Sequence, residues 1–143
     1  MIEEKPIIVD TNILFSALLQ QKSPFYELLI TGKCKFYICE LTVVELFRHK
    51  EKLIKSSKLS EDDIIKFFYF ILKKINIFKE DLIQTSNWYK AFQYCKEIDE
   101  ADTPFVALTL ELDGLLFTGD KALKQSLLKK GFDSFFKPEM EKS

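Results

Sequence analysis

The sequence predicts an α/β fold in which a central, mostly parallel sheet of four or five strands is covered on both faces by helices. Short apolar runs alternate along the chain with longer segments that have helical signals, and this alternation is typical of a parallel sheet. The first of these runs, at residues 6–9, is continuously apolar, as expected for a strand that is buried on both faces. The length of 143 residues, with 47% apolar and 30% charged residues, predicts a single domain over residues 1–143.

Short apolar runs next to turn or capping residues are the predicted strands. The first run, Pro-Ile-Ile-Val, ends at Asp10, and the last full run ends just before Gly119. The predicted strands are residues 6–9, 35–38, 76–78 and 115–118, and residues 134–136 are a candidate edge strand.

The segments between these runs carry helix start and stop signals. Pro24 and Pro104 suit the first turn of a helix, Ser60 is a capping residue, and Gly32 and Gly131 are typical stops. The predicted helices cover residues 12–21, 23–30, 42–56, 60–74, 83–98, 103–113 and 121–130.

Four acidic residues stand at the starts of predicted helices, and they are the candidate functional residues. Asp10 and Asp120 each closely follow a predicted strand, and ligands of open α/β sheets bind beyond the carboxyl ends of the strands. Glu45 and Asp102 begin two other predicted helices. We therefore expect these side chains to converge at one edge of the sheet.

Helix capping is the alternative explanation for three of these residues. Asp10 and Asp120 are of a type that is favoured at N-caps. Thr42 and Glu45 have the spacing of a capping box, which taken alone explains Glu45 better than a ligand role does.

The lead-in to Asp102 is explained less well by capping. Asp99, Glu100 and Asp102 lie within four residues of one another, and carboxylates 4 Å apart in water repel by about 1 kcal/mol per pair. A helix N-terminus stabilises one such charge, whereas a bound cation would gather all three. The alternatives stay open for each acid, but the set as a whole favours a cation site.

The residue types in this set favour a hard divalent cation. Carboxylates without histidine or cysteine partners suit Mg²⁺ or Mn²⁺, and His49 is the only histidine. The three cysteines contain no CxxC pair, which argues against a zinc site. Such carboxylate sites commonly hydrolyse phosphodiesters. The formal net charge of −1 is less basic than is usual for nucleic-acid binding, although a carboxylate site itself lowers the charge.

The chain resembles the PIN-domain ribonucleases in three stretches. These are Ile8-Val9-Asp10-Thr11-Asn12, the stretch Asp-Thr-Pro-Phe-Val-Ala-Leu at residues 102–108, and Phe117-Thr118-Gly119-Asp120. Their order and separations cover nearly the whole chain, and Glu45 falls where the family keeps its second acid. The resemblance implies a three-layer α/β/α sandwich and an endoribonuclease that depends on Mg²⁺ or Mn²⁺. It also implies that the catalytic metal ligands are Asp10, Glu45, Asp102 and Asp120.

The same resemblance implies supporting residues and partners. Asp99 would be an additional acid, and Asn12 and Thr118 would orient ligands or water. Many small members look like VapC-type toxins, so an RNA substrate, an antitoxin partner and a homodimer are expected. The stretch at residues 99–108, with its crowded acids and Pro104, is similar to a subgroup of the family and not to the commonest toxin sequence.

Two other functions fit an α/β chain with clustered acids. One is a catalytically silent PIN-like module that binds RNA or a protein. The other is a phosphoacceptor switch of the receiver type, but that class needs a pair of acids after its first strand, where Asp10 stands alone.

The chain start and the cysteine count predict a cytoplasmic location. The residues Met-Ile-Glu-Glu-Lys lack the apolar region of a signal peptide, and no apolar run approaches the roughly 20 residues that cross a bilayer. An odd number of cysteines without a disulfide pattern fits a reducing compartment. We therefore expect no contact with a membrane.

Overall fold

The computed structural model describes residues 5–19 and 24–138, which are organised around one parallel sheet. The strands are β1 (Ile7–Val9), β2 (Phe36–Cys39), β3 (Asn76–Phe78) and β4 (Leu115–Phe117). Their order across the sheet is β3-β2-β1-β4, and every neighbouring pair is parallel. The candidate edge strand at residues 134–136 forms only one parallel bridge, between Leu116 and Phe135.

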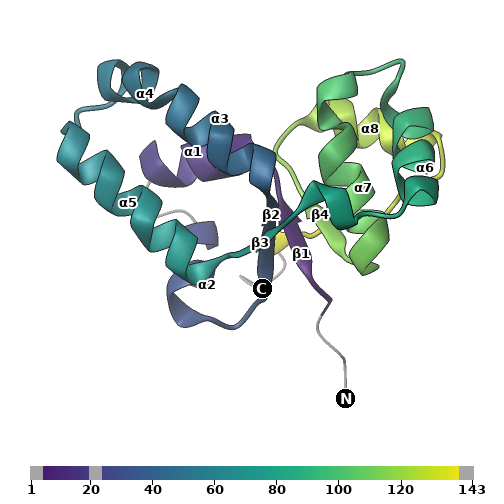
Figure 1. The fold of residues 1–143 in the computed structure, drawn as a ribbon, viewed down its shortest axis with the longest axis horizontal. Coiled ribbons are helices and arrows are strands. Elements are labelled where there is room, and N and C mark those ends of the chain that lie inside the picture. Colours follow the sequence, from purple (N-terminus) through teal and green to yellow (C-terminus); the bar gives the residue numbers. More distant parts are fainter. Residues whose placement is uncertain (1–4, 20–23, 139–143) are drawn as a thin grey trace.

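Helices cover both faces of this sheet, as predicted. The α-helices are α1 (Thr11–Leu19), α2 (Pro24–Thr31), α3 (Glu40–Arg48), α4 (Lys50–Ser56), α5 (Glu61–Lys74), α6 (Thr85–Cys95), α7 (Thr103–Leu112) and α8 (Lys121–Lys129), and the short 3₁₀ helices are η1 (Glu80–Leu82) and η2 (Glu100–Asp102). In Figure 1, α1 to α5 lie on one side of the sheet and α6 to α8 on the other. This arrangement confirms the predicted α/β/α fold.

Two hydrophobic cores hold the layers together, one on each face of the sheet. Ile7 and Val9 point into the core shared with α1 to α5, whereas Ile8, the residue between them, points into the core shared with α6 to α8. Successive side chains of a strand point to opposite faces, so a run of apolar residues is needed to fill both cores. The two cores fix β1 in the middle of the molecule, and its carboxyl end delivers Asp10.

The predicted helix at residues 42–56 was wrong at its start and in its continuity. The first helix, α3, begins at Glu40 directly after β2, and Cys39 is its N-cap without a side-chain hydrogen bond. A break at His49 then separates α3 from α4. Because Thr42 lies inside the helix, it cannot be the first residue of a capping box.

Other predicted helix ends agree more closely with the structure. The Ser60 hydroxyl accepts a hydrogen bond from the backbone N–H of Asp63 at 3.2 Å, which confirms the predicted cap of α5. The predicted helix at residues 83–98 is shorter, because α6 begins at Thr85 and ends at Cys95. The predictions for residues 20–23 lie outside the described residues. Within the described part of the chain, no helix is both long and apolar enough to span a membrane.

Gly114 allows β4 to lie against the start of β1, and this close approach gives a first prediction. A Cβ atom at this position would clash with the carbonyl oxygen of Pro6 and would lie 2.8 Å from the Cδ1 atom of Ile8. We expect Gly114→Ala to lower the free energy of unfolding by about 1–3 kcal/mol, as overpacked sites do.

Urea denaturation of Gly114→Ala and of Gly119→Ala measures this effect. Gly119 is the control, because a Cβ atom added there would lie 3.8 Å from its nearest neighbour, the Cδ1 atom of Ile13. Equal stability of the two variants would show that the space around Gly114 does not constrain the sheet.

Candidate functional site

Asp10 lies at the carboxyl end of β1, beside the end of β4. Val9 pairs with Phe117 in the parallel register, and the backbone N–H of Asp10 donates to the carbonyl of Phe117 at 3.2 Å. The side chain is only 6% exposed. One carboxylate oxygen accepts a hydrogen bond from the backbone N–H of Ile13 at 3.0 Å. Asp10 therefore caps α1, as the alternative explanation predicted, and it also occupies the predicted place at the sheet edge.

The end of β4 brings Thr118 and Asp120 to Asp10. The Thr118 hydroxyl is 2% exposed, donates to the carboxylate of Asp10, and accepts the backbone N–H of Asp120 at 3.2 Å. One Asp120 oxygen accepts from the backbone N–H of Leu123 at 3.0 Å, so Asp120 caps α8. Asn12 contacts Asp10 through its backbone N–H, while its own side chain is exposed. Of the two predicted supporting residues, Thr118 thus contacts the acid with its side chain and Asn12 with its backbone.

Glu45 reaches the same region from the second turn of α3. Its carboxylate accepts a hydrogen bond from the hydroxyl of Thr11 at 2.7 Å, across 34 residues of sequence. Because α3 begins at Glu40, the capping-box explanation of Glu45 is wrong. Thr11 was missing from the predicted site, although it stands directly after Asp10 in the first stretch of resemblance. Its position at a strand-to-helix junction was the available signal.

Asp102 and Asp99 have different local roles. An Asp99 oxygen accepts from the backbone N–H of Ala101 at 2.9 Å and so caps the short helix η2. Asp102 is the N-cap residue of α7, but its side chain makes no capping hydrogen bond. Capping therefore explains Asp99 and leaves the half-buried carboxylate of Asp102 available for another purpose.

Electrostatic repulsion shows that these acids lie close together. The pKa of Asp102 is raised to about 6, first by burial and then by the negative charges of Asp99, Asp10, Asp120 and Glu45, in that order. Burial also raises the pKa of Asp10, and the charge of Asp120 adds to this effect. None of the ion pairs found among residues 5–19 and 24–138 includes one of these five acids. Within the described residues, the cluster therefore carries negative charge that no ion pair balances.

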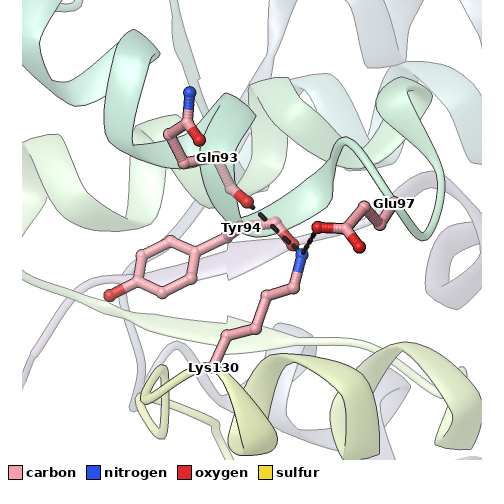
Figure 2. Close-up of polar contacts among 4 residues, drawn as sticks. All are labelled: Gln93, Tyr94, Glu97 and Lys130. Carbon is pink, nitrogen blue, oxygen red and sulfur yellow. Dashed lines mark hydrogen bonds and ion pairs between the residues drawn. The ribbon is translucent and has the colours of Figure 1, made fainter.

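Lys130 anchors the end of the helix that leads to Asp99. Its ammonium group donates to the backbone carbonyls of Tyr94 at 3.1 Å and Gln93 at 3.4 Å, and it lies 3.7 Å from a carboxylate oxygen of Glu97 (Figure 2). A cation near the carboxyl end of a helix satisfies carbonyls that lack partners inside the helix. Lys130 thus ties the end of α6 to the end of α8, and the turn carrying Asp99 follows directly.

The donor atoms of the cluster suit a hard divalent cation. They are carboxylate oxygens, some of them oriented by hydroxyl and backbone N–H groups, which are the ligands that Mg²⁺ and Mn²⁺ prefer. Among the described residues, no group of three acidic, histidine or cysteine side chains is close enough as it stands to hold one ion together. An ion shared by three of these acids would therefore require their side chains to move closer together.

The match to a sequence family identifies the fold that holds this cluster. The family model described as "PIN domain" matches residues 8–134, which run from the middle of β1 to the residue before the bridge at Phe135. The chain belongs to the PIN-domain family. Members of this family are generally nucleases.

Solved structures agree with the family assignment at the level of the fold. A chain of VapBC2 from Rickettsia felis, solved bound to a DNA fragment from their promoter, is 17% identical, with a TM-score of 0.66. That alignment covers 84% of this chain and 92% of the other. PAE2754 from Pyrobaculum aerophilum is 14% identical, with a TM-score of 0.62, over 85% of this chain and 79% of that one. No match was found among curated proteins.

The raised pKa of Asp102 predicts how the stability of the metal-free PIN domain depends on pH. The folded-state pKa of about 6 lies above the ordinary value of 3.8, so the folded chain takes up a proton at a pH where the unfolded chain does not. The cost of burial and repulsion of the ionised Asp102 is therefore present well above pH 6, and the free energy of unfolding rises as the pH falls from 7.5 to 5. Urea denaturation in EDTA at several pH values measures this gain.

Asp102→Asn is the matched variant for this measurement. It removes the titrating group and keeps the shape of the side chain. The variant should therefore be more stable than the wild type at pH 7.5, and its free energy of unfolding should rise less as the pH falls to 5. Parallel pH profiles of the two proteins would contradict the assignment of the repulsion to Asp102.

Proposed function

We propose that this PIN domain is an endoribonuclease that depends on Mg²⁺ or Mn²⁺. Its metal ligands and catalytic residues would be Asp10, Glu45, Asp102 and Asp120. The observation that carries the proposal is the convergence of acids at the carboxyl edge of the sheet, where Asp10 and Asp120 follow paired strands and Glu45 accepts from Thr11, the residue after Asp10. Burial and then the charges of four other acids raise the pKa of Asp102, which agrees with this convergence. No ion pair among residues 5–19 and 24–138 balances these charges, and a bound cation would do so.

The polar contacts of the cluster support the assignment of separate roles. Asp10 is held by the N–H of Ile13 and by the hydroxyl of Thr118, and Glu45 is held by the hydroxyl of Thr11. These donors fix carboxylates at the sheet edge before any ligand arrives, which reduces the ordering needed on binding. Asp102 is free of capping bonds, and Asp99 adds charge beside it.

A divalent cation at this place would supply two kinds of chemistry. It would lower the pKa of a bound water and would neutralise charge on the phosphodiester. The chain itself would orient the carboxylates through its backbone N–H groups and hydroxyls. Burial raises the pKa of both Cys39 and Cys95, so neither of these two thiols is activated as a nucleophile.

The substrate, the partners and the location belong to the same proposal. RNA is the expected substrate because of the resemblance of the three acidic stretches to PIN-domain ribonucleases. A cytoplasmic toxin restrained by an antitoxin, acting as a homodimer with one nuclease domain per chain, is the expected biological form. The likeness in fold to a VapBC2 chain is compatible with that form.

Replacement of Asp10 is the direct test of the proposed activity. Asp10→Asn keeps an oxygen for the N–H of Ile13 but removes the charge, so we expect cleavage of an RNA substrate in Mn²⁺ to fall by more than about 100-fold with the fold intact. Cleavage by the wild type should also stop in EDTA. The control is Asp113→Asn, the same chemical change at a side chain that is 94% exposed and distant from the cluster in the fold.

The outcomes of this test separate enzyme from binding module. Cleavage by Asp10→Asn at the rate of the wild type would reject the assignment of Asp10. A wild type that binds RNA but does not cleave it with Mg²⁺ or Mn²⁺ would favour the catalytically silent alternative.

Thr11 provides a second and milder test of the same site. Thr11→Val keeps the size of the side chain but removes the hydroxyl that Glu45 accepts from. We expect a loss of about tenfold in Mn²⁺ affinity, which is in the range found for groups that orient metal ligands. Calorimetric titration with Mn²⁺ measures the change, and Thr31→Val is the control, because the Thr31 hydroxyl only contacts a carbonyl of its own helix. Unchanged affinity in Thr11→Val would mean that Glu45 does not need this contact.

A further inference from the structure

The start of α3 has no capping side chain of its own. Cys39 is both the last residue of β2 and the N-cap of α3, so no loop separates the strand from the helix. Its thiol is not available as a cap, because it points to the carbonyl of Pro104 at 3.7 Å. The first backbone N–H groups of a helix have no partner within the helix and need one from elsewhere.

Glu80 supplies that partner from a distant part of the sequence. One of its carboxylate oxygens accepts from the backbone N–H of Glu40 at 2.9 Å, and the other accepts from the N–H of Leu41 at 3.1 Å. The sheet register explains the meeting. Cys39 pairs with Phe78 in the parallel ladder of β2 and β3, so the residues that follow each strand lie side by side.

The position of α3 matters because this helix carries Glu45. Glu45 lies five residues beyond Glu40, which is about 7.5 Å along the helix axis. The Glu45 carboxylate accepts a hydrogen bond from the hydroxyl of Thr11 at 2.7 Å. A hydrogen bond of this length tolerates little sliding or rotation of α3 against α1. The charges of Glu80 and Glu45 both raise the pKa of the Cys39 thiol, after burial, which agrees with their closeness to the same junction.

We propose that Glu80 is a positioning residue for the candidate metal site. It holds the first turn of α3 with both carboxylate oxygens, and through α3 it places Glu45 against Thr11, next to Asp10. The inference rests on the proposed function where its readout is metal binding. Glu80 itself does not contact the metal or the substrate in this account.

The chain contains a matched control for a purely structural cap. Glu111 accepts from the backbone N–H of Gln84 at 2.9 Å and from the side-chain amide of Asn87 at 2.8 Å, and so holds the first turn of α6. Like Glu80, it is a carboxylate from a distant segment that caps a helix. Glu111 lies nine residues beyond Asp102, about 13.5 Å along α7, so its loss should leave the acidic cluster in place.

The test compares Glu80→Ala, Glu80→Gln and Glu111→Ala in the full chain. Mn²⁺ binding is measured by electron paramagnetic resonance of the free ion, and the stability of each variant is measured by urea denaturation. We expect Glu80→Ala to weaken Mn²⁺ binding by about 10-fold to 100-fold. Glu80→Gln keeps one accepting oxygen and should show a smaller loss. Glu111→Ala should lose stability without losing Mn²⁺ affinity.

Two results would overturn the positioning role. One is wild-type Mn²⁺ affinity in Glu80→Ala at a stability loss similar to that of Glu111→Ala, which would make Glu80 a helix cap only. The other is equal weakening of Mn²⁺ binding in Glu80→Ala and Glu111→Ala, which would reflect general loosening of the fold. If Glu80→Ala does not fold, Glu80→Gln is judged against Glu111→Ala by the same criteria.

A metal-free measurement keeps this inference separate from the proposed function. If the wild type binds no Mn²⁺ and cleaves no RNA, the proposed function fails, and the nuclear magnetic resonance signal of the Thr11 methyl group then decides the role of Glu80. We expect a Glu80 variant to shift this signal, because Glu45 moves relative to the Thr11 hydroxyl, and we expect Glu111→Ala to leave it unchanged. An unmoved Thr11 signal in the Glu80 variants would reject the inference.

Discussion

Repulsion among carboxylates at one edge of the sheet is the constraint on which the rest of the candidate site depends. Asp10 and Asp120 follow neighbouring parallel strands, so the sheet itself brings them together. Three more acids add their charges to this region, and these are Glu45 from α3 and Asp99 and Asp102 from the segment before α7. Each charge added to a partly buried cluster raises the free energy of the folded chain. The fold must therefore hold these acids in place against their own repulsion.

The structure meets this constraint with donors that bind the carboxylates individually. Backbone N–H groups at the starts of α1 and α8 contact Asp10 and Asp120, and the Thr118 hydroxyl bridges the two residues. The donors to Asp10 favour the ionised form of that carboxyl and so oppose the effect of burial on its pKa. Such bonds orient the acids but add no positive charge. Among the ion pairs of residues 5–19 and 24–138, none neutralises these acids, and a divalent cation is the neutralising group that we propose.

Much of the fold follows from local sequence patterns. The apolar run at residues 6–9 predicts β1, because a strand covered on both faces needs apolar side chains in succession. The run at residues 76–78 also coincides with β3, although this edge strand is mostly exposed. The rule that ligands bind at the carboxyl ends of parallel strands then places Asp10 and Asp120 correctly at one edge. These features are encoded within a few residues of where they act.

The environment of Glu45 could not be predicted from local sequence in the same way. Its spacing from Thr42 imitates a capping box, yet the start of α3 is fixed by Glu80, 40 residues away from Glu40, and the Glu45 carboxylate is held by Thr11, 34 residues away. No local spacing encodes contacts at such separations. The start of α6 has a similar cause, because its first turn is held by Glu111 from α7. Local capping signals fail where tertiary contacts supply the partner.

The most direct test of the central claim is the position of Mn²⁺ in a crystal of the wild-type protein, determined from its anomalous scattering. The account predicts a strong anomalous peak at the carboxyl edge of the sheet, within bonding distance of carboxylate oxygens of Asp10 and of at least one of Glu45, Asp102 and Asp120. Peaks only elsewhere on the protein, or none at saturating Mn²⁺, would contradict it.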